Sequence, residues 1–379
     1  MKKHKHEIMN HEYLMTNGLG GYSFGTLDQV NCRKYHGLYT VSFNPPIERM
    51  HLISKISEVL SVDGVAFPLT YENVTSAENT ESNLMSYEHR GVVTQHFEII
   101  DIGVKVERTL AMAYGTNQLA VRYVIDTDKD IKLSMTPWFN FRDHHDTINA
   151  NALDYQATYD EMRHMMRVEA KEKAVYLKVE TSEEIHFEFV PEVKETPVCH
   201  YPIETQRGYP DAESHVILGS FTFNLAKGSN TVAFLVNLTD EFDTAESIFT
   251  GRKLRYEHLM QLADAGALAS ESYKRLVQAA DDFIVYRKTT GKMTILAGYP
   301  WFSDWGRDTM IAIPGLTLET GRSEEALQMI EGFLEMSSMG IIPNNFPDEG
   351  QAPMYNTSDG TLWLFRSEER RVWKDCRYR

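Results

Sequence analysis

The stretch Leu119-Ala120-Val121-Arg122-Tyr123-Val124-Ile125 has an apolar side chain at every second position. This is the period of a β-strand with one buried face. Similar apolar runs occur at 175–179, 185–189, 216–218 and 231–236. Turn-forming residues separate such runs at 63–64, 101–103, 115–117, 208–210 and 227–230. Short strands with frequent turns predict an antiparallel sandwich over residues 1–243 rather than alternating βαβ units.

The periodicity changes after Asp243. Residues 245–263 are rich in helix formers and contain no proline, so we expect a helical linker over 244–290. From Ser272 the apolar residues follow one helical stripe: Tyr273, Leu276, Val277, Ala280, Phe283 and Ile284. A further helix is predicted from an N-cap at Ser323 to Gly340, with a buried face of Ala326, Ile330, Phe333 and Leu334.

Composition excludes several classes of protein. The chain has 379 residues, 42% of them hydrophobic, which is enough for a sizeable core, and its formal net charge is −16. A negative field repels phosphate backbones and anionic lipid, so we expect no nucleic-acid and no membrane partner. No apolar segment follows the basic start at 1–7, so we expect no secretory signal. The chain has only three cysteines, far apart, so we expect a protein of the reducing cytoplasm.

Two motifs invite other interpretations. The glycine-rich stretch 17–21 resembles a dinucleotide loop, but Ser23 replaces the third glycine and no βαβ pattern surrounds it. Glycines that form tight turns at a sheet edge are the better interpretation.

His144 and His145 suggest a metal site, but adjacent residues of a strand point to opposite faces. Hydrogen-bonded residues at a domain interface are the better interpretation, and we expect no metal ion and no cofactor.

The segment 298–309 contains the densest group of chemically useful side chains. Trp301 and Trp305 can stack on sugar rings, while Asp304, Arg307 and Asp308 can bond to hydroxyl groups. The alternative is a buried Arg–Asp pair that only stabilises a core. Two further loops, 342–348 and 355–359, are rich in Asn, Asp and aromatic residues. Together the three segments favour one sugar pocket.

These segments, in this order, resemble the amylo-α-1,6-glucosidase family, the glycogen debranching enzymes of bacterial and archaeal type. The resemblance covers residues 10–365. It rests on the following stretches: Asn17-Gly18-Leu19-Gly20-Gly21-Tyr22, Arg33-Lys34-Tyr35-His36-Gly37-Leu38, Pro300-Trp301-Phe302-Ser303-Asp304-Trp305-Gly306-Arg307-Asp308-Thr309-Met310, Ile342-Pro343-Asn344-Asn345-Phe346-Pro347-Asp348 and Tyr355-Asn356-Thr357-Ser358-Asp359. Lys34 stands where arginine is more usual in the family.

The resemblance implies an amino-terminal antiparallel β-supersandwich, a helical linker and the beginning, at 291–365, of an (α/α)6 barrel of glucoamylase type. It also implies inverting hydrolysis of the α-1,6-linked glucose at branch points of glycogen or a branched α-glucan. Trp305, Arg307 and Asp308 resemble the family's clamp on the terminal glucose. By their position in the same pocket we add the following residues: Asp304, Asn344, Asp348, Tyr355, Asn356 and Asp359.

The chain departs from the family pattern after Phe365. Twelve helices need about 250 residues, and some 90 follow Lys288. The family's general acid and base are therefore expected downstream, and we expect the 379-residue chain to be inactive. Residues 366–379 carry six basic and three acidic residues. They are interpreted as a non-native segment, with a basic interaction tail as the alternative.

Two other functions remain open. Another glucoamylase-like enzyme, such as a trehalase or an α-1,4-glucosidase, would also recognise a terminal glucose. A non-catalytic glycan-binding module would need only the sandwich.

Overall fold

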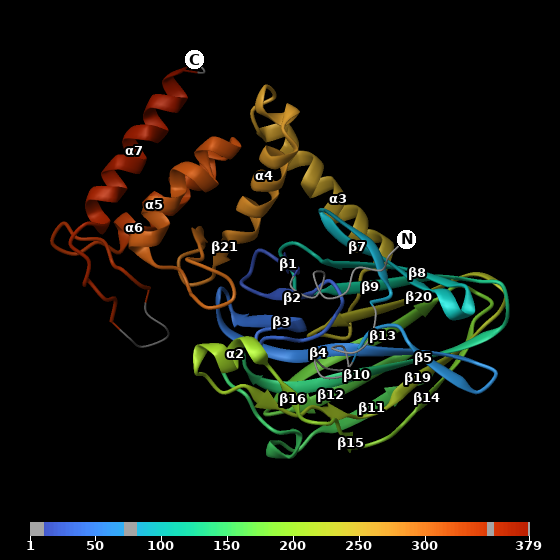
Figure 1. Ribbon diagram of the computed structural model, residues 1–379. Coiled ribbons are helices and arrows are strands. Elements are labelled where there is room, and N and C mark those ends of the chain that lie inside the picture. Colours follow the sequence, from blue (N-terminus) through green and yellow to red (C-terminus); the bar gives the residue numbers. More distant parts are fainter. Residues whose placement is uncertain (1–10, 72–81, 347–351, 378–379) are drawn as a thin grey trace. The chain divides into compact units, whose positions relative to one another are not determined.

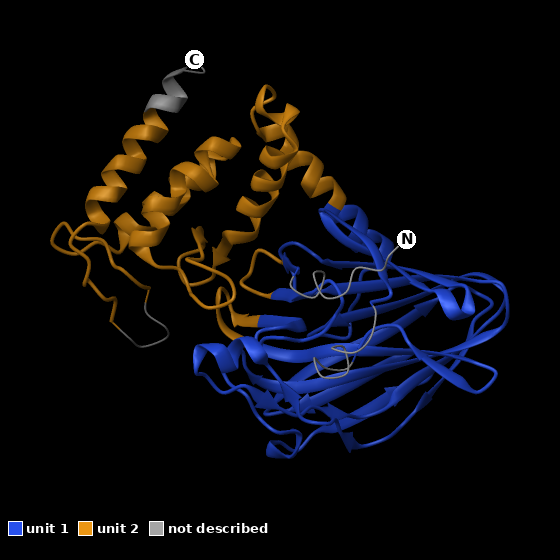
Figure 2. Cartoon of the chain, viewed as in Figure 1, with its two compact units in different colours: residues 1–15, 22–41, 50–252 blue, residues 16–21, 42–49, 253–379 orange. Residues whose placement is uncertain are grey.

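The computed structural model describes residues 11–71, 82–346 and 352–377, so the basic start and Asp348 lie outside it. The chain forms two compact units (Figure 2). The first contains residues 1–15, 22–41 and 50–252, and the second contains 16–21, 42–49 and 253–379. Two short amino-terminal segments thus belong to the unit that holds most of the helices.

The first unit is a sandwich of two large antiparallel sheets (Figure 1). One sheet contains β1 (Glu12–Thr16), β2 (Tyr22–Thr26), β3 (Gly37–Asn44), β4 (Ile47–Val62), β5 (Val65–Pro68), β10 (Ile131–Asp143), β14 (His186–Val190), β15 (Lys194–Glu195), β18 (Val216–Ile217) and β19 (Ser220–Leu225). Its order is β1-β2-β3-β4-β10-β18-β15, with β5 beside β4 and the pair β19-β14 beside β10.

The other sheet has the order β11-β12-β13-β20-β9-β8-β7-β6. Its strands are β6 (Leu84–Arg90), β7 (Val92–Ile99), β8 (Val104–Met112), β9 (Leu119–Thr127), β11 (Gln156–Asp160), β12 (Met165–Ala170), β13 (Lys173–Thr181) and β20 (Gly228–Asn237). A small pair, β16 (Cys199–His200) and β17 (Ala212–Glu213), lies outside both sheets. The predicted β-rich amino-terminal part is confirmed.

The alternating residues of β9 form part of the core between the sheets. Leu119, Val121, Tyr123 and Ile125 are all buried, as their spacing predicts. Phe221 of β19 meets Phe234 of β20 edge to face, with ring centroids 5.4 Å apart. One polar bond also joins the sheets, because the Tyr123 hydroxyl donates to Oε1 of the buried Glu58 at 2.7 Å. The core is therefore apolar with a satisfied polar contact inside it.

The helices follow the predicted pattern in outline. They are α2 (Pro202–Arg207), α3 (Ala245–Leu262), α4 (Glu271–Phe283), α5 (Gly306–Leu316), α6 (Ser323–Glu335) and α7 (Gly360–Arg377). Within the first unit, Ile248 and Phe249 of α3 pack on the second sheet. Within the second unit, the strands β21 (Ile284–Arg287) and β22 (Lys292–Ile295) pair, and α5, α6 and α7 enclose a core that includes Met310, Phe333 and Leu364. Across the described ranges, every helix is too short or too polar to cross a membrane.

Several local predictions were wrong. Ser323 is the first helical residue rather than the N-cap, and α6 ends at Glu335 instead of Gly340. Leu334 and Leu276 are 48% and 67% exposed, so neither belongs to a buried face of its helix. Ile284 lies in β21 rather than in the helix before it. Tertiary pairing overrides helical periodicity at residues 284–287, because β22 provides a strand partner there.

Helix α7 continues through the segment interpreted as non-native. Ser367 is fully buried, and its hydroxyl donates to the Met310 carbonyl of α5 at 2.6 Å. Arg371 forms an ion pair with Glu368 at 2.7 Å, one helical turn away. Residues 366–372 therefore pack as part of the second unit, while their origin stays a prediction.

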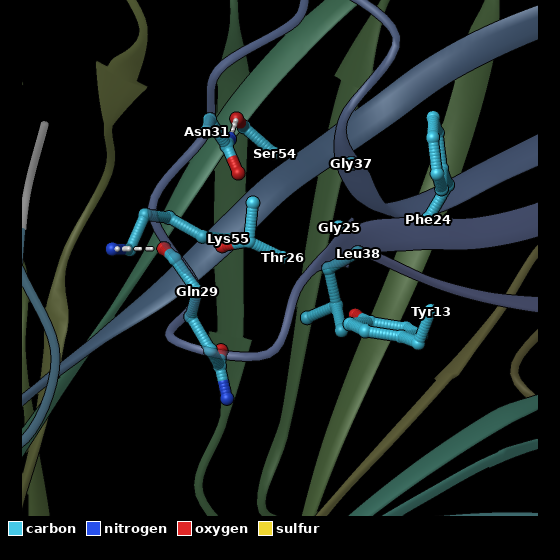
Figure 3. Close-up of a pocket in the computed structure, with 10 residues that line it drawn as sticks. All are labelled: Tyr13, Phe24, Gly25, Thr26, Gln29, Asn31, Gly37, Leu38, Ser54 and Lys55. Carbon is cyan, nitrogen blue, oxygen red and sulfur yellow. Dashed lines mark hydrogen bonds between the residues drawn. The ribbon is translucent and has the colours of Figure 1, made fainter. Parts of the chain in front are cut away.

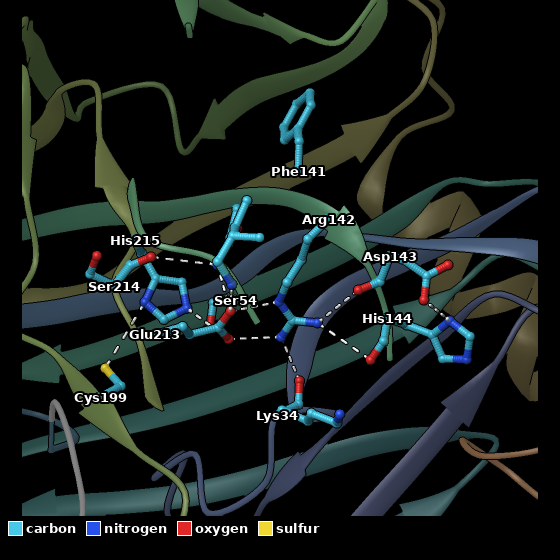
Figure 4. Close-up of polar contacts among 12 residues, drawn as sticks. Lys34, Ser54, Phe141, Arg142, Asp143, His144, Cys199, Glu213, Ser214 and His215 are labelled. Carbon is cyan, nitrogen blue, oxygen red and sulfur yellow. Dashed lines mark hydrogen bonds and ion pairs between the residues drawn. The ribbon is translucent and has the colours of Figure 1, made fainter. Parts of the chain in front are cut away.

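A buried polar cluster lies inside the first unit (Figure 4). The side chains of Arg142 and Glu213 are fully buried, and two bonds of 2.7 Å join the guanidinium to the carboxylate. The Tyr201 hydroxyl also donates to Glu213, at 2.5 Å. His215 lies 3.7 Å from the same carboxylate, yet burial lowers its pKa to about 4. The pKa of the neighbouring His51 is held well below its ordinary value by burial and then by the charge of Arg142.

These histidines should make the sandwich sensitive to acid. In the unfolded chain they take up protons near pH 6.5, whereas the folded chain keeps them neutral, so the free energy of unfolding should fall as the pH drops from 7 to 5. For His215 alone we expect a loss of about 2 kcal/mol, measured by urea denaturation at both pH values. His215→Gln should flatten this dependence, while His200→Gln, at an exposed position, should not. Equal stability of the wild-type chain at pH 7 and pH 5 would contradict the prediction.

Candidate functional site

The N-terminus of α5 is capped by a loop distant in sequence. Trp305 occupies the N-cap position of α5, and its indole makes no capping bond. Asn344 does this instead: its carbonyl accepts from the Gly306 N–H at 2.8 Å, and its Oδ1 accepts from the Arg307 N–H at 3.4 Å. A Cβ on Gly306 would lie 2.1 Å from the Pro343 carbonyl oxygen, so glycine is needed there. These contacts fix the direction in which Arg307 leaves the helix.

Arg307 and Asp359 meet beside this helix end. The Arg307 Nε donates to both carboxylate oxygens of Asp359, each at 3.0 Å. Trp363, one turn into α7, donates its indole N–H to Oδ2 of the same carboxylate at 3.3 Å. The bond from Arg307 holds the pKa of Asp359 below its ordinary value. Both charged side chains remain partly exposed, at 45% and 39%, so a ligand can reach them.

The other candidates come from the same three segments of the chain as this pair. Nδ2 of Asn344 donates to Oδ1 of the exposed Asn356 at 3.0 Å, which ties the two loops together. Tyr355 is exposed, and its hydroxyl donates to the Met336 carbonyl at 2.8 Å. Asp308 is exposed in the first turn of α5, and Trp305 is half-buried. Arg307, Asn344, Asn356 and Asp359 are therefore linked by hydrogen bonds, while Trp305 and Asp308 are their chain neighbours.

Asp304 has a different environment from the other candidates. It is 1% exposed, and both its oxygens accept from Arg287, with Nε to Oδ2 at 2.6 Å. The Arg287 guanidinium also lies over the Phe346 ring, 4.7 Å from the centroid. Asp304 is therefore one half of a buried Arg–Asp pair, as in the structural alternative to sugar binding, but its partner Arg287 lies outside the segment 298–309.

Sequence reasoning missed two arginines that hold the loop. Arg287 is one, and Arg49 is the other: its Nη1 donates to the Pro300 carbonyl at 3.0 Å and its Nη2 to the Phe302 carbonyl at 2.7 Å. Arg49 belongs to the short segment 42–49 of the second unit. No local pattern marks either residue, because their partners are distant in the chain or lie in a loop without a periodic signal.

The glycine-rich stretch 17–21 forms a tight turn between β1 and β2. Oδ1 of Asn17 accepts from the N–H groups of Leu19 and Gly21 at 2.9 and 3.0 Å. Gly20 adopts φ +92°, and a Cβ there would lie 2.5 Å from the Pro46 carbonyl oxygen. The Gly18 carbonyl accepts from the Tyr286 N–H at 2.8 Å. The turn therefore supports β21 in the second unit, as the interpretation of a structural glycine loop requires.

Other candidates in the first unit do not form a site. His144 and His145 follow the end of β10 in a turn with ring centroids 3.9 Å apart, so the prediction that they point to opposite faces of a strand was wrong. In the portion of the chain described, no three His, Cys, Asp or Glu side chains are grouped to hold a metal ion. Burial, with the charge of Glu12 second, raises the pKa of the Cys32 thiol to about 11, so it is a poor nucleophile.

A cavity beside Tyr13 and Lys55 is too small for a sugar (Figure 3). Its volume is about 10 Å³, which is room for about one water molecule. Lys55 lies at its edge and donates to the carbonyls of Gln29 at 3.1 Å and Tyr71 at 2.7 Å. The cavity is therefore a packing feature of the sandwich.

Comparison with known proteins agrees with the two-part organisation. The family described as "Glycogen debranching enzyme N terminal" matches residues 11–232, and the family described as "Amylo-alpha-1,6-glucosidase" matches residues 278–373. A glycogen debranching enzyme of Saccharomyces cerevisiae is 40% identical over 77 residues, which are 19% of this chain and 5% of that protein. The chain therefore corresponds to a small part of the yeast relative.

Solved structures show a similar fold at low sequence identity. A bacterial glucoamylase complexed with acarbose has a TM-score of 0.56 at 7% identity, covering 97% of this chain and 57% of that one. A protein named "Putative kojibiose phosphorylase from human microbiome" has a TM-score of 0.51 at 9% identity, covering 95% and 53%. Both structures share the fold of this chain, and the match to the first family spans more than half of the chain. The chain belongs to the glycogen debranching enzyme family, the amylo-α-1,6-glucosidases.

Proposed function

We propose that this chain carries the glucose-binding part of an inverting α-1,6-glucosidase that acts on the branch points of glycogen. The cluster of Arg307, Asn344, Asn356 and Asp359 at the ends of α5 and α7 carries the proposal. A pyranose presents several hydroxyl groups around an apolar ring. Charge-assisted bonds in fixed directions hold the hydroxyl groups of one terminal ring, and the indole of Trp305 covers its apolar face.

The neighbouring acids have different proposed roles. Asp308 is exposed and bonds to sugar hydroxyls directly, together with Asn356 and, more weakly, Tyr355. Asp304 is a positioning residue, because both its oxygens are engaged by Arg287. It holds the loop that presents Trp305 instead of contacting the sugar. Asp348 stays a predicted contact of the same pocket.

We assign no general acid or base among these residues. An inverting glycosidase needs a carboxylic acid that keeps its proton and a carboxylate that activates water, roughly 6.5–9.5 Å apart. The hydrogen bond from Arg307 lowers the pKa of Asp359 and keeps it ionised, so it suits binding better than proton donation. The proposal therefore places the acid and the base outside this cluster.

The clamp predicts how substitutions change sugar affinity. Trp305→Ala and Arg307→Gln should each weaken binding of isomaltose about tenfold, or ~1.4 kcal/mol. The first removes the aromatic face, and the second removes the charged hydrogen-bond donor. Isothermal titration calorimetry on the 379-residue chain measures this. Tyr209→Ala, which removes an exposed aromatic side chain of the first unit, is the control and should change nothing. Unchanged affinity in both clamp variants would refute the proposed site.

Substitution by asparagine should have different effects at Asp304 and at Asp308. Asp304→Asn leaves Arg287 buried without a counter-charge, so we expect the second unit to lose about 3–5 kcal/mol of stability. Asp308→Asn should keep the stability and weaken only sugar binding. Thermal unfolding and calorimetry on both variants separate the two roles. A stable Asp304→Asn chain would show that the buried pair does not hold the loop.

Binding and hydrolysis should be separable in this chain. The purified 379-residue chain should bind a branched dextrin but release no glucose from it above the background of the buffer, because the cluster supplies contacts without an acid and a base. Comparing α-1,6-linked with α-1,4-linked substrates in the same assay tests the linkage as well. Glucose release by this chain would show that the acid and base lie within residues 1–379.

A further inference from the structure

We propose that the outward face of the first sheet carries an accessory groove that binds a neutral α-glucan chain. The groove lies within the first unit and is distinct from the Arg307–Asp359 cluster. Its volume is about 640 Å³, within the range of small-ligand sites and much larger than the cavity beside Lys55. The choice of an α-glucan as the ligand rests on the proposed function.

Four strands bring one row of polar side chains to this groove. His186 of β14 pairs with Asn224 of β19, Asn224 pairs with Lys132 of β10, and Lys132 pairs with Ser61 of β4. Since neighbouring strands lie about 4.8 Å apart, the row extends roughly 14 Å across the sheet. That is the length of a short oligosaccharide rather than of a single sugar.

The alternation of each strand turns this row away from the core. Ile131 and Leu133, on either side of Lys132, are buried, and so are Phe223 and Leu225 on either side of Asn224. Lys132, His186 and Asn224 are exposed. Within the described residues these three side chains make no hydrogen bond or ion pair, so their donors and acceptors are available to a ligand.

Carboxylates line the end of the groove where the strands turn. Asp63, Asp130 and Glu184 lie in the turns before β5, β10 and β14. They are not grouped closely enough with other ligating side chains of the described chain to hold a metal ion. Together with Lys132 they leave the groove negative, which disfavours phosphates and acidic glycans. A neutral chain of hydroxyl groups both donates and accepts hydrogen bonds, and therefore matches this mixture of side chains.

The test is electrophoresis of the 379-residue chain in native gels with and without glycogen. The double variant Lys132→Ala/Asn224→Ala should bind glycogen about tenfold more weakly than the wild-type chain. The matched control is Glu98→Ala/Lys105→Ala, because these residues are paired on neighbouring strands of the other sheet. Since Lys132 and Asn224 are exposed, the thermal unfolding midpoints should stay unchanged.

The variant Arg307→Gln separates this proposal from the proposed function. If the groove exists, Arg307→Gln should still be retarded by glycogen while its binding of isomaltose falls. If Lys132→Ala/Asn224→Ala is retarded as strongly as the wild-type chain, the groove proposal is overturned. Loss of retardation in Arg307→Gln would also overturn the groove, because glycogen binding would then depend on the glucose clamp alone. Absence of retardation for the wild-type chain would also overturn the groove, and the isomaltose titration would then decide the clamp independently.

Discussion

The buried pair of Arg287 and Asp304 holds the loop on which the candidate site depends. A guanidinium and a carboxylate at about 1% exposure are stable only when each satisfies the other, so removal of one partner leaves an uncompensated charge. The loop 298–305 is also bonded by Arg49 through two of its carbonyls. Trp305 and the first turn of α5 follow directly from this segment. The position of Trp305 and of the start of α5 therefore depends on the buried side chains of Arg49 and Arg287 rather than on the helix itself.

The proposed clamp combines a rigid base with accessible charged groups. Asn344 supplies the helix cap that Trp305 cannot, and it connects the loop to Asn356. Arg307 and Asp359 are paired with each other but remain partly exposed. A sugar can exchange with that pair at a modest cost, because exposed ion pairs contribute little to stability. Rigid surroundings and replaceable polar contacts are the combination that a binding site for a neutral polyol needs.

The two proposed glucan contacts differ in physical character. The clamp uses an indole face and fixed charges, which suit one terminal ring, whereas the groove uses a polar row on a sheet, which suits several sugar units in succession. A protein that acts on a large branched polymer gains residence time from a second weak contact, because the first contact raises the effective concentration of the other.

Local sequence patterns predicted the period-two strands and the change to helical periodicity after Asp243, and they contain the motifs that resemble the family. Those signals are local, because each depends on residues only a few positions apart. The tertiary structure alone decided that Asp304 is a buried ion-pair partner while Asp308 is exposed, that Asn344 caps α5, and that segments 16–21 and 42–49 belong to the second unit. It also left Leu276 and Leu334 exposed. A carboxylate has the same chemistry in either environment, so only the partners brought from distant parts of the chain distinguish a structural acid from a binding one.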